Sequence, residues 1–380
     1  MGYDVVIAAC IFAAWVYLTA ARGGFWLASV RDGESPPLPT QWPLVAAVVP
    51  ARDEADCVGE SVGSLLDQNY PGALSVILID DQSSDGTAAV ASCAAEMRGA
   101  SDRLTIVSGK PPPPGWMGKT WAQQQGMDMA QRQPVPPSYV LLTDADIVHG
   151  PDTLSWLVAQ AQSTGSVLTS LMAKLNCKSF AEQALVPAFI YFFQMLYPFR
   201  WVNEPVRATA AAAGGCMLVD CGALMQAGGV AAIADAVIDD CALAKKLKER
   251  GPIWLGLTER ARSIRSYPRL SDIRRMVTRS AYAQLRYSPV LLAGTTAALG
   301  LVYVGPVMFA VIGSGTAQVL GIASWILMAV SFGPTLMFYG MPGWWPPALP
   351  AIAVIYLGFT IDSAWQHMRK GGAIWKGRVV

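Results

Sequence analysis

Acidic side chains follow two of the apolar segments in the middle of the chain. Asp80 and Asp81 come directly after one segment, and Asp144 and Asp146 come directly after another. Clustered carboxylates repel one another, so such a group needs a compensating partner. Turn and helix-cap chemistry accounts for residues 85–87 (DGT) but does not require the other four carboxylates. A divalent cation does, because an Asp-x-Asp loop offers it hard oxygen ligands. The residues therefore indicate a metal or nucleotide site, with turn formation alone as the alternative.

These carboxylates are positioned by a predicted alternation of strands and helices. The predicted strands cover residues 44–49, 74–79, 104–107 and 139–143, and the predicted helices cover residues 54–67, 87–97 and 119–132. Alternation of this kind builds a mostly parallel sheet with helices on both faces. In such sheets ligands bind beyond the carboxyl ends of the strands, where the acidic residues are expected. The prediction is an α/β domain with a Rossmann-like sheet.

The composition excludes two broad classes of protein. Lys and Arg total 28 and Asp and Glu total 27, and this near-neutral balance argues against a protein that coats nucleic acid. Charged residues make up 14% of the chain, against roughly 25% in a soluble domain. Residues 288–361 contain no Asp, Glu, Lys, Arg or His at all. Neither a wholly soluble protein nor a disordered one has this composition.

Membrane attachment is therefore expected at both ends of the chain. We predict an N-terminal transmembrane anchor (residues 1–26), a soluble domain (42–285), a C-terminal transmembrane region (288–366) and a basic tail (367–380). A cleaved signal peptide is the alternative for the first segment. No basic region precedes its apolar run, and Arg22 with the following aromatic residues is typical of an interface anchor.

The number of C-terminal crossings follows from length and charge. Residues 290–312 and 317–339 are each long enough to span a membrane, whereas residues 344–361 contain three prolines and could span, re-enter or lie at the interface. Arg22, Arg31 and the basic tail all prefer the cytoplasmic side. Both ends satisfy this preference only if an even number of C-terminal segments cross. We expect two crossings and one re-entrant or interfacial segment.

In order and spacing, the acidic motifs after the predicted strands resemble those of the family 2 glycosyltransferases. These are membrane-attached enzymes with a GT-A fold. The resemblance implies that Asp81 binds the nucleoside, where the family uses an Asp for the uracil imide. It implies the same nucleoside role for the residues after the first strand, namely Pro50, Ala51, Arg52 and Glu54. Asp144-Ala145-Asp146 resembles the Asp-x-Asp motif that holds Mg²⁺ or Mn²⁺ against the donor diphosphate.

The resemblance also implies a catalytic base. Asp239 and Asp240 stand where the family has an acidic pair whose second carboxylate is the base. The alternative is an ordinary acidic pair in the first turn of a helix. Lys119, in residues 115–122 (GWMGKTWA), belongs to a stretch similar to a signature of glycosyltransferases that act on polyisoprenoid lipids. It is expected near the donor phosphates, with a solvated helix-start lysine as the alternative.

Two further residues are expected at the donor. Gly215, after an alanine-rich run, would line the sugar pocket, where backbone must approach closely; a turn entering a strand is the alternative. Arg286 lies in residues 284–287 (QLRY), which are similar to a Q-x-x-R-W motif but one residue shorter and with Tyr in place of Trp. It could clamp a phosphate through two hydrogen bonds. The apolar residues 186–201 would lie either in the membrane interface or in the protein core.

Several longer segments resemble the hopanoid-biosynthesis-associated glycosyltransferases. They are residues 192–197 (FFQMLY), 209–218 (TAAAAGGCML), 238–247 (IDDCALAKKL) and 251–257 (GPIWLGL). The implied function is inverting transfer of a sugar from a nucleotide-diphosphate donor, expected to be a UDP-sugar, to a membrane lipid such as a hopanoid. The domain would face the cytoplasm from a multi-pass position in the inner membrane. The alternatives are transfer to a polyprenyl phosphate and a non-catalytic membrane scaffold that retains nucleotide binding; no protein partner is indicated.

Overall fold

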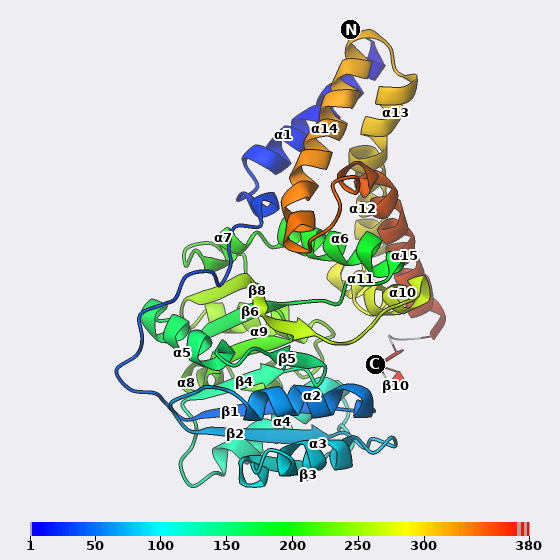
Figure 1. Cartoon of the computed structure of the whole chain (residues 1–380). Helices are drawn as coiled ribbons and strands as arrows, with labels where there is room; N and C mark the ends of the chain where they lie inside the picture. The colour runs from blue at the N-terminus through cyan, green and yellow to red at the C-terminus, as the bar shows by residue number, and fades with distance from the viewer. Residues whose placement is uncertain (1, 371–373, 376–377, 380) are drawn as a thin grey trace.

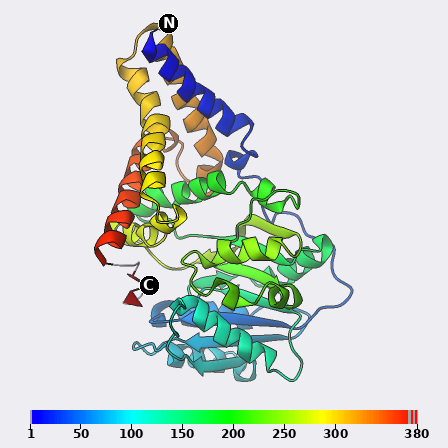
Figure 2. The ribbon, with the colours of Figure 1, turned by 180° about the vertical axis from the view of Figure 1, so that it is seen from behind.

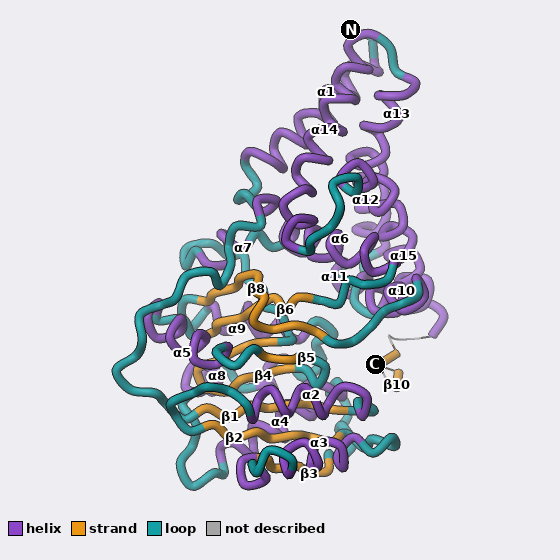
Figure 3. The backbone as a smooth tube through the Cα atoms, viewed as in Figure 1, coloured by secondary structure: helices purple, strands orange, loops and turns teal. Residues whose placement is uncertain are grey.

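The computed structural model describes residues 2–370, 374–375 and 378–379, so Lys376 of the predicted basic tail lies outside the described residues. A sheet domain forms one half of the molecule, and a bundle of long helices extends from it (Figures 1 and 3). The N-terminus lies at the far end of this bundle. The two halves correspond to the soluble and apolar parts of the sequence.

The sheet domain contains one eight-stranded mixed sheet in the order β3-β2-β1-β4-β7-β6-β8-β5. Its strands are β1 (Val45–Ala51), β2 (Leu74–Asp80), β3 (Leu104–Ser108), β4 (Tyr139–Thr143), β5 (Ile147–His149), β6 (Leu168–Lys174), β7 (Cys216–Asp220) and β8 (Ile253–Ser263). Strands β1 to β4 run parallel, and β7 pairs antiparallel with both β4 and β6. A separate two-stranded pair consists of β9 (Ile374–Trp375) and β10 (Arg378–Val379).

Helices cover both faces of the sheet. Those of the sheet domain are α2 (Ala55–Leu66), α3 (Thr87–Glu96), α4 (Gly118–Gln131), α5 (Thr153–Thr164), α8 (Cys221–Gln226) and α9 (Asp239–Lys248). The four predicted strands and the three predicted helices are therefore confirmed, with ends that differ by no more than two residues. The GT-A α/β fold class with a mostly parallel sheet is confirmed as well.

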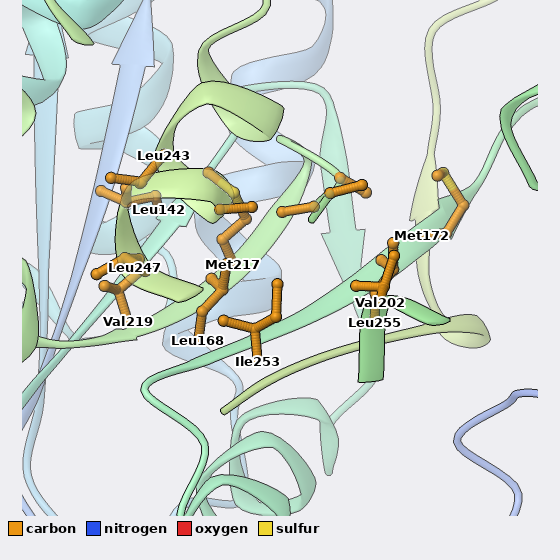
Figure 4. Packing of buried hydrophobic residues seen from close by; sticks show 14 of the residues in the cluster. Leu142, Leu168, Met172, Val202, Met217, Val219, Leu243, Leu247, Ile253 and Leu255 are labelled. Atoms are coloured by element: carbon orange, nitrogen blue, oxygen red, sulfur yellow. The ribbon is translucent and has the colours of Figure 1, made fainter. Parts of the chain in front are cut away.

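Alternate residues of each strand supply two separate cores, as the two-residue period of a strand requires. Leu141 points to the core beneath α2, α3 and α5, whereas its neighbour Leu142 points to the core beneath α9. Figure 4 shows the second core, in which two leucines of α9, Leu243 and Leu247, pack over the sheet. This packing fixes α9, and with it the acidic pair at its start, against β4 and β7.

The helix α6 (Phe180–Leu196) joins the two halves of the molecule. It lies between the sheet domain and the long helices (Figures 1 and 2). Val186 and Ile190 pack in the sheet-domain core, while Leu185 and Tyr191 pack in the core of the bundle. Of the two alternatives for this apolar segment, the structure favours a buried helix, because both of its faces are covered by protein.

Four helical segments are long and apolar enough to cross a membrane: Tyr3–Ala20, Pro289–Ile312, Gly315–Phe338 and Pro346–Arg369. They comprise α1 (Tyr3–Ala20), α12 (Pro289–Leu299) continued by α13 (Gly305–Ile312), α14 (Gly315–Phe338) and α15 (Leu349–Lys370). The remaining short helices are α7 (Phe199–Asn203), α10 (Leu270–Thr278) and α11 (Ala281–Gln284).

The last of these segments differs from the others in position. Helix α15 starts part-way along the bundle and runs toward the sheet domain, which is also the direction of α14 (Figures 1 and 2). Its C-terminal half contacts α10 and the turn after α11: Asp362 pairs with Arg274 through two hydrogen bonds, and His367 stacks on Tyr287. Two crossings followed by a partly inserted segment remain our prediction, since this last segment is also long and apolar enough to cross completely. The three prolines lie before the helix or in its first turn, so they do not interrupt it.

Candidate active site

Lys119 links two of the predicted acidic groups. It lies in the first turn of α4, and its Nζ is 2.9 Å from Asp144 Oδ1 and 3.2 Å from Asp239 Oδ2. Burial alone would lower the pKa of Lys119, but the two carboxylates outweigh it and the pKa is raised. Gln123, one turn further along α4, also donates to Asp239 Oδ2 at 3.2 Å. The solvated-lysine alternative is therefore wrong.

Asp240 occupies a more restricted environment than its neighbour. Its Oδ2 accepts the Gly214 N–H at 2.9 Å, and its Oδ1 accepts the Cys241 N–H at 2.7 Å. Burial and repulsion from Asp239 raise the pKa of Asp240 to about 6, despite the opposing charge of Lys119. A carboxylate with this pKa is a stronger base than an exposed aspartate and is still ionised at neutral pH.

The backbone approaches Lys119 and Asp240 at Gly214 rather than at Gly215. A Cβ atom placed on Gly214 would lie 3.1 Å from Lys119 Nζ and 3.3 Å from Asp240 Oδ2. A Cβ on Gly215 would instead meet the side chain of Ile147 in β5, and the Gly215 carbonyl accepts the Thr143 hydroxyl at 2.7 Å. The alanine-rich run therefore ends at the carboxylates, as expected, but one residue earlier than Gly215.

Asp146 is paired with an arginine that sequence reasoning did not single out. Arg265, just after β8, donates from Nε to Asp146 Oδ2 at 2.9 Å and also pairs with Glu54 at the start of α2. The Ser263 hydroxyl donates to the same Asp146 oxygen at 3.1 Å. In the sequence, Arg265 is one of eight arginines between residues 259 and 287, and no local signal distinguishes it.

The residues predicted to bind the nucleoside lie at the carboxyl ends of β1 and β2. The Arg52 guanidinium donates to the Asp81 carbonyl at 2.7 Å and lies 3.7 Å from its carboxylate, and Asp81 is only 2% exposed. The Asp81 N–H donates to the carbonyl of Ala51 at 2.8 Å, and Pro50 lies in β1, in register with Ile79 of β2. The two strand ends are therefore fixed to each other at the sheet edge.

Together these contacts place Asp81, Asp144 and Asp240 along one edge of the sheet. Asp81 follows β2, Asp144 follows β4 between β1 and β7, and Lys119 joins Asp144 to the helix that carries Asp240. Residues that are distant in sequence thus form one polar site.

Arg286 lies apart from this site. Its side chain is exposed, and among the residues that the structure describes it makes no ion pair. Its neighbour in the motif, Gln284, donates to the Tyr197 hydroxyl at 2.6 Å. Burial, together with the nearby Cys241 and Asp240, raises the pKa of Tyr197 to about 12. Gln284, rather than Arg286, is therefore the residue of this motif that reaches toward Asp240, through Tyr197.

The residues of the Asp-x-Asp loop fit a divalent cation that is shared with a ligand. Within the described part of the chain, no three or more His, Cys, Asp or Glu side chains form a metal cluster on their own. Mg²⁺, however, is usually bound by one or two carboxylates together with waters and substrate phosphates. The Asp144 side chain is 37% exposed and offers hard oxygens toward solvent, and Asp146 lies two residues away. The donor set suits a metal–diphosphate complex.

Comparisons with known proteins agree with this geometry. Residues 46–226 match the family model for glycosyl transferase family 2. This chain carries a family 2 glycosyltransferase domain. A mannosyltransferase from Pyrobaculum calidifontis, solved in complex with GDP-Man and Mn²⁺, has 18% identical residues and a TM-score of 0.58, over 96% of this chain and 99% of that one. The similarity in fold therefore includes the helical bundle.

Other solved structures are less similar to this glycosyltransferase. A glucosyl-3-phosphoglycerate synthase from Mycobacterium tuberculosis, in complex with Mg²⁺ and UDP, has 16% identity and a TM-score of 0.40, over 64% of this chain and 79% of that one. A mannosyl-3-phosphoglycerate synthase from Rubrobacter xylanophilus has 18% identity and a TM-score of 0.40, over 70% and 84% of the two chains. No curated protein matches the sequence.

Proposed function

We propose that this glycosyltransferase is an inverting enzyme that moves a sugar from a nucleotide-diphosphate donor to a membrane lipid. One observation carries the proposal: Asp240, half-buried and with its pKa raised to about 6, lies beside Lys119 and Gly214 on the edge that also holds Asp144. A general base, a cation and a pair of metal-binding carboxylates thus share one site.

The donor would bind along the sheet edge. Asp81, which is almost completely buried beside Arg52, would recognise the nucleoside base, and Lys119 lies where it can balance the charge of the diphosphate. Asp144 and Asp146 would hold Mg²⁺ or Mn²⁺, which when bound supplies Lewis-acid stabilisation of the leaving diphosphate. A UDP-sugar is the donor that the position of Asp81 favours.

Asp240 would then accept the proton of the acceptor hydroxyl. As that oxygen bonds to the anomeric carbon, the bond from this carbon to the diphosphate breaks on the opposite face. The configuration at the anomeric carbon is therefore inverted in one step. Asp239 is held by Lys119 and Gln123, so we assign it a positioning role rather than that of the base. The two adjacent carboxylates thus differ in function because their partners differ.

The position of the site relative to the bundle supports a lipid acceptor. Tyr197, which approaches Asp240, directly follows α6, and α6 packs against the apolar helices. A hydroxyl held at headgroup depth could reach the base from this side, while the donor arrives from water. We place the sheet domain on the cytoplasmic face of the inner membrane, where nucleotide sugars are available.

The test uses purified full-length protein in lipid nanodiscs with Mn²⁺ and a panel of UDP- and GDP-sugars. Nucleoside diphosphate release and glycolipid formation are measured with a hopanoid alcohol or a polyprenyl phosphate as acceptor. We expect turnover with the hopanoid alcohol and a loss of about 10³-fold in Asp240→Asn. Asp102→Asn, at an exposed carboxylate remote from the site, is the matched control and should retain full activity.

The outcomes separate the alternatives. Turnover only with the polyprenyl phosphate would reassign the acceptor and remove the need for a general base, because a phosphate oxygen is already ionised at neutral pH. Nucleotide binding without turnover under any condition would favour a non-catalytic scaffold.

A further inference from the structure

A cavity lies where the N-terminal helix α1 meets the sheet domain. It has a volume of about 700 Å³, and its lining includes Gly23, Arg200, Trp201 and Arg207. It is separate from the candidate active site. Lys248, at the end of α9, donates to the Trp201 carbonyl, whereas Asp240 lies in the first turn of this ten-residue helix, roughly 12 Å away by helix rise.

Positive charge dominates this cavity. The guanidinium groups of Arg22 and Arg207 each lie 5.0 Å from the centre of the Trp201 ring. Arg22 is also held by the carbonyl of Met195 at the end of α6, at 3.1 Å, so it fixes the wall of the cavity. Arg207 is paired with a nearby glutamate, Glu204, at 2.9 Å. With two arginines and one carboxylate in its lining, the cavity retains a net positive charge.

Arg200 is the arginine available for a ligand. Its side chain is exposed, and its hydrogen bond to the Ser29 hydroxyl is long, at 3.3 Å. A guanidinium group binds a phosphate through two parallel hydrogen bonds and does so better than an ammonium group. The left-handed backbone of Gly23 (φ 64°) keeps this wall open, because a Cβ there would lie 2.8 Å from Trp201 Nε1.

The rim of the cavity has the composition of a membrane interface. Tyr17 and Trp26 line it, and both residue types concentrate at the level of lipid headgroups. Leu27 is 40% exposed and Val206 is 88% exposed, so apolar side chains project into the surroundings next to the arginines. The cavity also lies at the end of α1, an apolar helix long enough to cross a membrane. The arginines that would bind a phosphate and the apolar side chains that would face lipid thus lie beside the same cavity.

We infer that this cavity binds the phosphodiester headgroup of an anionic phospholipid, with Arg200 as its principal contact. The bound lipid would fix the junction of α1, α6 and α7 at the membrane surface. This inference does not rest on glycosyl transfer, since the cavity shares no residue with the candidate active site. Its test therefore needs no activity measurement.

Native mass spectrometry of the full-length protein in micelles with equimolar phosphatidylglycerol and phosphatidylcholine of matched chains tests the inference. We expect selective retention of phosphatidylglycerol, reduced about tenfold in Arg200→Gln because a charge-assisted contact is lost. Arg132→Gln removes an equal charge from the end of α4 and should bind as wild type does. Arg200→Lys keeps the charge and should be intermediate.

Three results would overturn the inference. The first is equal retention of the two lipids, and the second is equal retention by Arg200→Gln and Arg132→Gln. The third concerns the source of the phosphate: if millimolar inorganic phosphate displaces phosphatidylglycerol and raises the thermal unfolding midpoint to the same extent, the cavity is a small-anion site. Phosphate without effect on the bound lipid supports the lipid headgroup.

Discussion

The chemistry that we propose depends on the difference between two neighbouring carboxylates. Asp239 is neutralised by Lys119, whereas Asp240 is half-buried and accepts the backbone N–H groups of Gly214 and Cys241. Two aspartates with different partners can perform two tasks in one site, as acid–base chemistry at neutral pH requires.

The raised pKa of Asp240 predicts the acid limb of the activity profile. The base must be ionised, so kcat should fall about tenfold per pH unit below about 6 and level off above it. In Asp239→Asn the repulsion is removed and the Asp240 pKa should decrease, so the residual activity should extend to lower pH. Steady-state kcat measured between pH 4 and 8 gives the acid limb of the wild type and that of Asp239→Asn. An acid limb at the same pH in the two proteins would contradict the assignment of Asp240 as the base.

Gly214 should be sensitive to the smallest possible substitution. In Gly214→Ala the new Cβ lies against Lys119 Nζ and Asp240 Oδ2, so one of them must shift by a few tenths of an ångström. Since misplacement by about 1 Å can reduce a rate 10²-fold, we expect kcat to fall about tenfold. Gly33→Ala is the control, because a Cβ at Gly33 would contact nothing within 4 Å. Equal rates for the two variants would show that the close approach is not needed.

At the scale of elements, one side chain joins three parts of the site. Arg265 follows β8 and pairs with Glu54 at the start of α2 and with Asp146 after β4, both of which are largely buried. These pairs hold the Asp-x-Asp loop against the strand ends.

Removal of this arginine should destabilise the fold. Arg265→Gln removes a cation that pairs with two largely buried carboxylates, which should cost about 2–3 kcal/mol; the 31% exposure of Arg265 keeps this below the value of a fully buried pair. Arg275→Gln breaks an exposed i,i+3 pair and should cost less than about 1 kcal/mol. The thermal unfolding midpoints in detergent compare the stability of Arg265→Gln with that of Arg275→Gln. A midpoint for Arg265→Gln as high as that for Arg275→Gln would rule out the proposed role.

The sequence predicts the elements better than it predicts the contacts between them. The strands β1 to β4 could be located because each is a short apolar run, and the Asp residues that follow β2 and β4 could be placed at one edge of the sheet. The partner of Glu54 could not be found in this way, since Arg265 lies 211 residues further along the chain and only the fold brings it close. For the same reason, Gly214 could not be distinguished from Gly215.

At the scale of the whole molecule, the apolar helices and the sheet domain share α6 as a common core element. The directions of the long helices predict on which side of the membrane each connecting segment lies. Helices α14 and α15 both run toward the sheet domain, so the two chain segments after them should lie on its side of the membrane (Figures 1 and 2).

Cysteine labelling with a membrane-impermeant reagent tests this topology. Cys93 is exposed on α3 and marks the side of the sheet domain once the other cysteines are replaced. Met368→Cys, near the end of α15, should be labelled from the same side as Cys93. Ser314→Cys, just before α14, should be labelled only from the opposite side. Labelling of Met368→Cys together with Ser314→Cys would show that α15 crosses the membrane completely.

The central claim is that the sheet-edge carboxylates bind a metal ion and a nucleotide diphosphate together. Calorimetric titration of UDP and GDP into the full-length protein, with and without Mn²⁺, tests it most directly. We predict that Mn²⁺ strengthens binding of one nucleotide at least about tenfold in the wild type and in Asp102→Asn, and has no such effect in Asp144→Asn. If neither nucleotide binds in the presence of Mn²⁺, or if Asp144→Asn binds as tightly as the wild type, the claim is contradicted.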